Sequence, residues 1–142
     1  MGVDYAIRPH LGAGEIAFGM TPNQVRALLG DPFESFKRSP LAEFPCDHFE
    51  SLGIFVYYQA PGIVEALEYH QPASPTLDGI SLLATPVARL IGLATEKDPG
   101  ATVEDDSVTC LAQGWGAWLP DAEDHPDRPA ESIIVFRRGY YD

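Results

Sequence analysis

Cys46, Asp47 and His48 bring together a thiol, a carboxylate and an imidazole, the groups that a zinc site or a cysteine nucleophile uses. A thiol and an imidazole two residues apart share a face only if the strand is regular, and no second Cys-His pair completes a zinc set. A catalytic pair would also need an orienting partner and an oxyanion donor, which the sequence does not indicate. We therefore expect neither catalysis nor metal binding at this cluster.

The segment PDAEDHPDRPA, residues 120–130, places several carboxylates and one imidazole in a single stretch. Its spacing fits no calcium-loop pattern and lacks the final bidentate glutamate, so it is interpreted as a solvated acidic loop. Gly12-Ala13-Gly14 is also no phosphate-binding loop, because it has neither the glycine spacing nor the lysine of one. We expect a protein that is not an enzyme and that carries no cofactor or metal.

The charge of the chain is strongly one-sided. Asp and Glu number 21 against 9 Lys and Arg, which gives a net charge of −12. Such a surface repels the phosphates of nucleic acids and anionic lipids, and it attracts basic macromolecules. Acidity can also serve only to keep a protein in solution. The charge therefore excludes nucleic-acid and membrane partners and favours a basic protein partner.

The N-terminus and the cysteines indicate the compartment. MGVDYAIRPHLG has neither the basic nor the apolar region of a signal peptide, and no apolar stretch reaches the ~18 residues of a membrane span. Two cysteines, Cys46 and Cys110, suit a reducing compartment as buried, unpaired thiols. The sequence predicts a cytoplasmic protein without a disulfide.

FGMTPNQVRALLGDP, residues 18–32, has the signals of a short helix. Thr21 is the expected N-cap, with Pro22 in the first turn and Gln24 completing a capping box. Val25, Leu28 and Leu29 form an apolar stripe, and Gly30 ends the helix in a left-handed turn.

A second Thr-Pro pair, Thr85-Pro86, begins a similar segment. VARLIG, residues 87–92, matches VRALLG, residues 25–30, down to the closing glycine. GEIAFG at 14–19 likewise resembles DGISLL at 78–83. The sequence predicts two similar helix starts with Thr85 as the second N-cap; the alternative is a coincidence between two ordinary caps.

Each helix is followed by segments rich in aromatic and β-branched residues, which predict strands. After the first helix they are residues 48–59 and 62–70, joined by a turn at Ala60-Pro61-Gly62; after the second they are residues 102–114, 115–119 and 131–141. We expect an α+β fold in which two tandem units, about residues 10–70 and 80–142, are joined by a linker at 71–79. Their strands would form one continuous antiparallel sheet with the helices on one face.

The string GEIAFGMTPNQVRALLGDP resembles the helix signature of the SmpA/OmlA (BamE-like) lipoproteins and of the β-lactamase inhibitory protein family. The tandem organisation is most similar to the inhibitor family. This resemblance implies two helix-plus-sheet units whose sheets form a concave surface that binds another protein.

Aromatic residues concentrate on the expected strands. Alternation places Phe55 and Tyr57 on one face and Ile54, Val56 and Tyr58 on the other. A face without helices would display rings among carboxylates, as in a protein interface; the alternative is that these rings belong to the core.

The acidic net charge, the repeated helix start and the lack of catalytic motifs together favour a binding protein. The most concrete expectation is an immunity or inhibitor protein that occludes the active site of a basic bacterial toxin or enzyme. The expected contacts are Tyr57, Trp115, Trp118, Asp121, Glu123, Asp124 and Asp127. One alternative is a small-molecule-binding domain or enzyme with a pocket between sheet and helices, using His48 or His70. Another is a structural homodimer that pairs through the terminal strand SIIVFRRGYY; the oligomeric state is left as monomer or homodimer.

Overall fold

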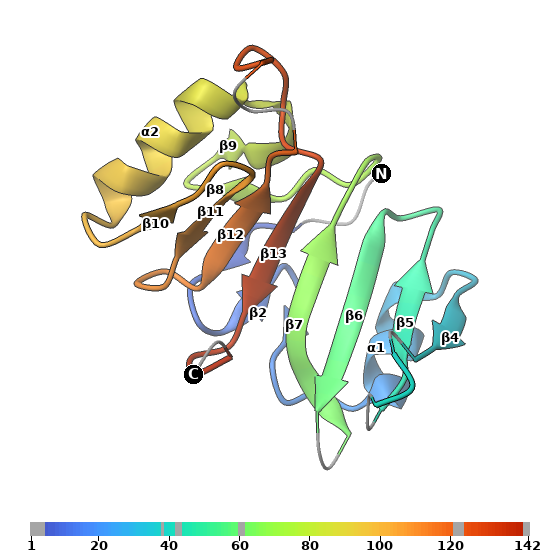
Figure 1. Ribbon diagram of the computed structural model, residues 1–142. Helices are drawn as coiled ribbons and strands as arrows, with labels where there is room; N and C mark the ends of the chain where they lie inside the picture. Colours follow the sequence, from blue (N-terminus) through green and yellow to red (C-terminus); the bar gives the residue numbers. More distant parts are fainter. Residues whose placement is uncertain (1–4, 38, 42–43, 60–61, 121–123, 141–142) are drawn as a thin grey trace.

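An eight-stranded antiparallel sheet is the largest element of the molecule (Figure 1). The computed structural model describes residues 5–37, 39–41, 44–59, 62–120 and 124–140. The strands run in the order β10-β11-β12-β13-β7-β6-β5-β4, and two smaller sheets, β1-β2-β3 and β8-β9, accompany them. With two α-helices, this is an α+β fold with antiparallel strands, as the sequence predicts.

The strands of the large sheet come from two separate stretches of chain. The first stretch gives β4 (Glu34–Phe36), β5 (Cys46–Phe49), β6 (Ile54–Gln59) and β7 (Ile63–Tyr69). The second gives β10 (Thr102–Val103), β11 (Ser107–Cys110), β12 (Trp115–Trp118) and β13 (Ser132–Phe136). The predicted hairpin of β6 and β7 is present, and residues 60–61 of its turn lie outside the described residues.

The two stretches meet where β7 pairs antiparallel with β13, in a register that sets Glu68 opposite Ile134. The terminal strand therefore lies in the interior of the sheet, between β12 and β7. Both of its edges are occupied, so the expectation of a homodimer formed through this strand is wrong. The strands at the two edges of the sheet are β10 and β4.

Helix α1 (Pro22–Leu29) has the predicted caps. Thr21 accepts from the Gln24 amide, the Gln24 side chain accepts from the Thr21 amide, and Gly30 adopts a left-handed conformation with φ 67°. Val25 and Leu29 are buried as expected, whereas Leu28 is 38% exposed. The apolar stripe of this short helix is therefore narrower than predicted.

Helix α2 (Val87–Lys97) begins differently from the prediction. The Thr85 hydroxyl donates to the Ser81 carbonyl and does not cap the helix, and the N-cap position is Pro86. The first amides of the helix instead donate to carbonyls of a later loop: Val87 to Arg128 and Ala88 to Pro126. Since these carbonyls satisfy the free donors, no capping side chain is needed.

The helix also continues past the glycine that was expected to close it. Gly92 lies within α2, which ends at Lys97. The two helical segments therefore differ at both ends, and the similar helix starts predicted from the sequence are not seen.

Short strands precede each helix. They are β1 (Ile7–Arg8), β2 (Gly12–Ala13), β3 (Ile16–Ala17), β8 (Thr76–Leu77) and β9 (Ile80–Ser81), the last followed by the 3-10 turn η1 (Leu82–Ala84). The expected linker at 71–79 thus contains β8, with Leu77 buried, and Thr76 bridges to Ala6. It is part of the packed structure.

One core lies between the sheet and the helices. Val25 and Leu29 of α1 and Leu90 and Ala94 of α2 belong to the same buried cluster as the alternate residues of the large sheet. Figure 1 shows α1 and β2 behind that sheet, with α2 at the upper left beside β10. No helix among the described residues is long and apolar enough to cross a bilayer.

A buried ion pair fixes α1 on the sheet. Asp47 on β5 is fully buried and accepts two hydrogen bonds from the Arg26 guanidinium, at 2.8 and 2.9 Å. The Tyr58 hydroxyl donates to the same carboxylate at 2.8 Å. These bonds satisfy a charge that would be costly to bury alone, and the hydrogen bond to Asp47 raises the pKa of Arg26.

Arg26→Met should destabilise the protein, because it leaves the buried Asp47 carboxylate without its cation. We expect the free energy of unfolding to fall by about 3 kcal/mol. This value is at the lower end of the range for breaking a buried ion pair, because the Arg26 side chain is partly exposed. Adding Asp47→Asn should recover part of the loss. Urea unfolding followed by tryptophan fluorescence measures these values. Arg89→Met, at an exposed position of α2, is the control; an equal effect of both single variants would contradict the assignment.

Candidate functional site

The face of the large sheet opposite the helices is not covered by them. We call it the open face. Its residues alternate with those of the core, and a small second cluster of Cys46, Tyr57, Ala66 and Phe136 packs on it. The open face comprises Glu34, Phe36, Cys46, His48, Phe55, Tyr57, Ala66, Glu68, Ser107, Thr109, Gly116, Trp118, Ser132, Ile134 and Phe136.

The predicted alternation of β6 is confirmed. Ile54, Val56 and Tyr58 lie in the main core, whereas Phe55 and Tyr57 belong to the cluster on the open face. The register of β6 against β7 shifts between Tyr57 and Tyr58, so that Tyr58 stands opposite the core residue Val64.

Glu68 lies in the middle of the open face. In the sheet it stands between Ile134 on β13 and Phe55 on β6. The Ser132 hydroxyl donates to its Oε2 atom at 2.8 Å, and the Tyr57 hydroxyl donates to Oε1. Because each carboxylate oxygen is held by a different strand, the charge has a fixed position.

Trp118 flanks this carboxylate at the end of β12. It pairs with Ser132 and is 48% exposed. A cavity of about 200 Å³ lies beside it. The open-face side chains around this cavity are Glu68, Thr109, Trp118, Ser132 and Ile134, with Gly116 between them.

A second group of rings lies toward β4. His48 stacks on Phe55, with ring centroids 3.9 Å apart and an interplanar angle of 3°. Its Nε2 atom is 3.0 Å from Nε2 of His70, which follows β7. The backbone carbonyl of Gln71 lies 2.7 Å from His70 Nδ1.

These distances assign the tautomers of the histidine pair. A carbonyl only accepts, so His70 carries its proton on Nδ1 and offers the Nε2 lone pair. His48 must then donate from Nε2. Burial and the nearby His70 lower the pKa of His48, while Glu50 and Glu34 act in the opposite direction.

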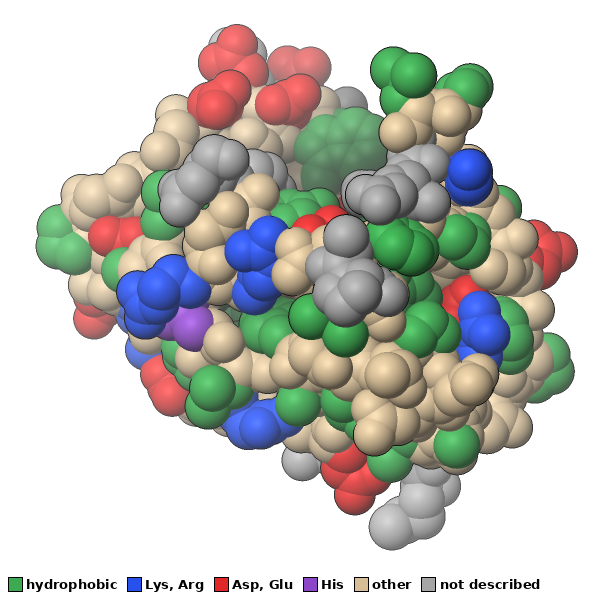
Figure 2. All heavy atoms as spheres, turned by 90° about the horizontal axis from the view of Figure 1, so that it is seen from below, with side chains coloured by type: hydrophobic (Ala, Val, Ile, Leu, Met, Phe, Trp, Pro, Cys, Tyr) green, Lys and Arg blue, Asp and Glu red, His purple; other side chains and the backbone are tan. Residues whose placement is uncertain are grey.

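A wider cavity adjoins His48. Its volume is about 510 Å³, and it is lined by Asp31, Pro32, Phe33, Glu34, His48, Glu50 and Ser51. Carboxylates therefore lie along the β4 end of the sheet, and exposed Glu104, Asp105 and Asp106 follow β10 at the other end. Seen from below, one group of acidic side chains lies at the upper left, and other acidic side chains are scattered among Lys and Arg (Figure 2).

The expected aromatic contacts separate in the structure. Trp118 is exposed, and Tyr57 lies on the open face but is only 6% exposed. Trp115 is fully buried in the main core, so the expectation that it contacts a partner is wrong. Trp115 and Trp118 are three residues apart on one strand, and an odd spacing places them on opposite faces.

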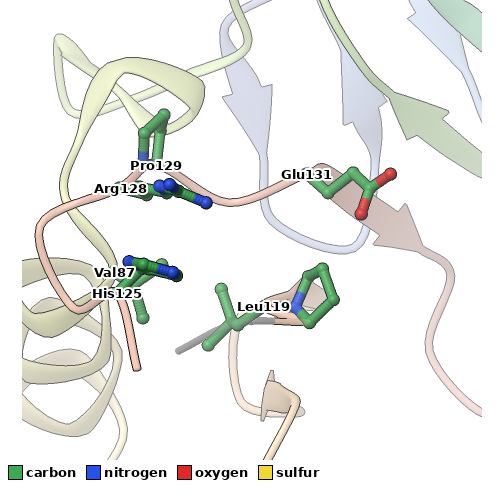
Figure 3. Close-up of a pocket in the computed structure, with 7 residues that line it drawn as sticks. Val87, Leu119, His125, Arg128, Pro129 and Glu131 are labelled. Atoms are coloured by element: carbon green, nitrogen blue, oxygen red, sulfur yellow. The ribbon is translucent and has the colours of Figure 1, made fainter. Parts of the chain in front are cut away.

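The acidic loop is partly docked against α2. Asp124 and Asp127 are exposed, while Asp121 and Glu123 lie outside the described residues. Beside the loop is a cavity of about 300 Å³, with Val87, His125 and Arg128 along one side and Leu119 along the other (Figure 3). The described carboxylates of the loop are solvated, as expected, while two of its backbone carbonyls accept hydrogen bonds from the start of α2.

The remaining chemical candidates lie apart. Cys46 and His48 share the open face, whereas Asp47 points to α1. Cys46 and Cys110 are both buried, as predicted, and they lie in different clusters. No three potential ligands among the described residues are placed to hold a metal ion.

His48 and His70 lie on the open face, so neither can act in a pocket between sheet and helices.

Glu68 was missed by the sequence-based interpretation, although a signal existed. IVEALEY, residues 63–69, places two glutamates among residues that predict a buried strand. A carboxylate at such a position needs hydrogen-bond donors, and here they come from Tyr57 and Ser132. The pairing with Ser132, 64 residues away, has no local signal.

Comparison of the chain with protein families, curated proteins and solved structures finds no match.

Acidification should reduce stability through His48. Its pKa in the folded protein is below the ordinary 6.5, so the unfolded chain binds the proton more readily. The free energy of unfolding should fall as the pH drops below 6.5 and level off below the lowered pKa. Urea unfolding between pH 7.5 and 4.5 measures this. His48→Gln should remove that part of the slope and His125→Gln should keep it; an unchanged slope in His48→Gln would contradict the assignment.

Cys110 should be unreactive in the native protein. Burial raises its pKa from 9.0 to about 11, which lowers the thiolate fraction about 100-fold. In a Cys46→Ser variant at pH 8, Ellman's reagent should therefore modify Cys110 at least about 100-fold more slowly than after unfolding. Equal rates in the two states would show that the thiol is accessible.

Proposed function

We propose that this chain is a cytoplasmic protein-binding module, most concretely an immunity or inhibitor protein that occludes the active site of a basic bacterial toxin or enzyme. The observation that carries the proposal is the open face itself, where an oriented carboxylate, Glu68, lies beside the half-exposed ring of Trp118. Tryptophan and tyrosine are frequent hot spots of protein interfaces, and a fixed charge selects a partner of opposite sign.

Charge complementarity supports a basic partner. The chain carries a net charge of −12, and exposed carboxylates lie near both edge strands of the sheet. Such a field accelerates encounter with a cationic protein and repels an anionic one. Association should therefore weaken as the salt concentration rises.

The mechanism would be occlusion without chemistry. Trp118 and the rings around Phe55 would cover the mouth of a basic cleft, with Glu68 facing its cations. Asp124 and Asp127, together with Asp121 and Glu123, would extend this contact from the loop at the end of the sheet. The open face is well ordered by its own hydrogen bonds, so little entropy would be lost on binding.

The proposal includes a tandem origin for the sheet, like that of the inhibitor family which the first helix resembles. Two features support it. Each stretch of chain runs from a two-residue strand through a helix to four antiparallel strands. The last strands of the two stretches, β7 and β13, pair antiparallel, as expected for units related by a two-fold rotation.

A small-molecule-binding protein is the second candidate. The observation in its favour is the cavity of about 510 Å³ beside Phe33 and His48, a size that suits a small ligand. A thermal-shift screen against small molecules tests it, and a hit abolished by His48→Gln would favour this function.

Capture of a partner should depend on the open face. Tagged protein incubated at low salt with lysate of its source organism should retain one basic protein in equal stoichiometry, and salt should release it. Trp118→Ala should lose most of this binding because it removes the exposed anchor, whereas Leu28→Ala, on the exposed side of α1, should not.

The purified partner then decides the function. Its activity should be inhibited by the wild-type chain in a one-to-one complex and not by Trp118→Ala. A captured protein whose binding or activity is indifferent to Trp118→Ala would overturn the proposal.

A further inference from the structure

Among the described residues, Glu68 is a part-buried carboxylate without a cation, unlike Asp47 and Glu65, the buried and part-buried carboxylates that form ion pairs. Asp47 pairs with Arg26, and Glu65 pairs with Arg137. In the part of the chain that the structure describes, no lysine or arginine lies within ion-pair distance of Glu68. Its two partners are hydroxyl groups, which orient the carboxylate and leave its charge in place.

The carboxylate also has unused capacity to accept. An ionised carboxylate has about four lone-pair positions, and Tyr57 and Ser132 occupy one on each oxygen. A further donor can therefore approach either oxygen without displacing those that hold it. The approach is from the open face, where Glu68 lines the cavity of about 200 Å³.

Gly116 makes room for this cavity. It stands opposite Ile134 in the row that leads to Glu68. A Cβ atom at this position would lie 2.9 Å from the Val108 carbonyl oxygen and 3.5 Å from Ile134 Cγ2. The missing side chain thus leaves a depression between Trp118 and Glu68 that any larger residue would narrow.

The side chains around the depression suit one kind of ligand. Trp118 offers an exposed aromatic ring, Ile134 an apolar surface, and Glu68 a negative charge at the far side. A long cationic side chain has the complementary parts: an apolar stem and a charged head that binds aromatic faces and carboxylates.

We propose that this cavity binds an arginine side chain of the basic partner, with the guanidinium between Trp118 and Glu68; the inference rests on the proposed function and names the chemistry of its contact. Arginine is favoured over lysine because its planar group stacks on rings, donates to both oxygens of a carboxylate and loses hydration at lower cost. The aliphatic stem packs on Ile134.

N-acetyl-arginine amide is the probe that tests the site without the partner. Titration followed by ¹H–¹⁵N NMR should give saturable binding in the millimolar range that shifts the indole N–H signal of Trp118. The signal of buried Trp115 serves as the internal reference. N-acetyl-citrulline amide has nearly the same shape without the charge, and it should not bind.

Matched variants locate the contact. Glu68→Gln should weaken the binding of the arginine amide at least tenfold, whereas Glu96→Gln, at an exposed position of α2, should not change it. Trp118→Phe keeps an aromatic residue in the strand and should weaken binding. An unchanged indole N–H signal of Trp115 would confirm that this variant is folded.

The outcomes separate this site from the function it serves. Three results would overturn the arginine site. They are the absence of arginine-amide binding, equal binding of the citrulline amide or of the corresponding amide of lysine, and unchanged binding in Glu68→Gln. Capture of a basic protein that depends on Trp118 would then still support the proposed function. Binding of the arginine amide without any captured partner would support the site and contradict the function.

Discussion

The antiparallel pairing of β7 with β13 is the contact on which the rest of the sheet depends. It joins two four-stranded runs that are separated along the chain by α2 and the short strands before it. Both runs turn their apolar residues to the same side, so α1 and α2 share one core. The junction thereby leaves the opposite side without cover, and it brings Ser132 within 2.8 Å of Glu68.

The open face is stable without helices because its side chains bind one another. Phe55 stacks on His48, Phe136 on Tyr140, and Tyr57 lies beneath its neighbours with its hydroxyl bound to Glu68. A partly buried carboxylate is tolerated at the centre of this surface because both of its oxygens accept hydrogen bonds. Much of the order that a binding surface needs is therefore already present.

The sequence predicted best where the interactions are local. The capping box of α1 joins residues three apart, and the Thr21 and Gln24 side chains form it as expected. Thr85 has the same sequence context but a different partner, because carbonyls some forty residues later already satisfy the first amides of α2. Alternation assigned the faces of β6 correctly, because successive residues of a strand point to opposite faces.

The candidate site was harder to predict than the fold. The sequence identified Trp118 by residue type, but it could not separate Trp118 from Trp115 until the start and register of β12 were known. Glu68 was missed because its donors come from β6 and β13, and only the sheet order brings these strands to either side of β7. Contacts between distant segments depend on the whole topology, which local patterns do not contain.

The two helices differ in how far along the chain the partners of their first amides lie. Every hydrogen bond of the α1 cap is available once residues 21–30 have been made, so this helix can begin to form while the chain is still growing. The first amides of α2 find their protein partners only after Pro126 and Arg128 have left the ribosome. The native start of α2 therefore requires the closure of a loop of about forty residues, which the start of α1 does not.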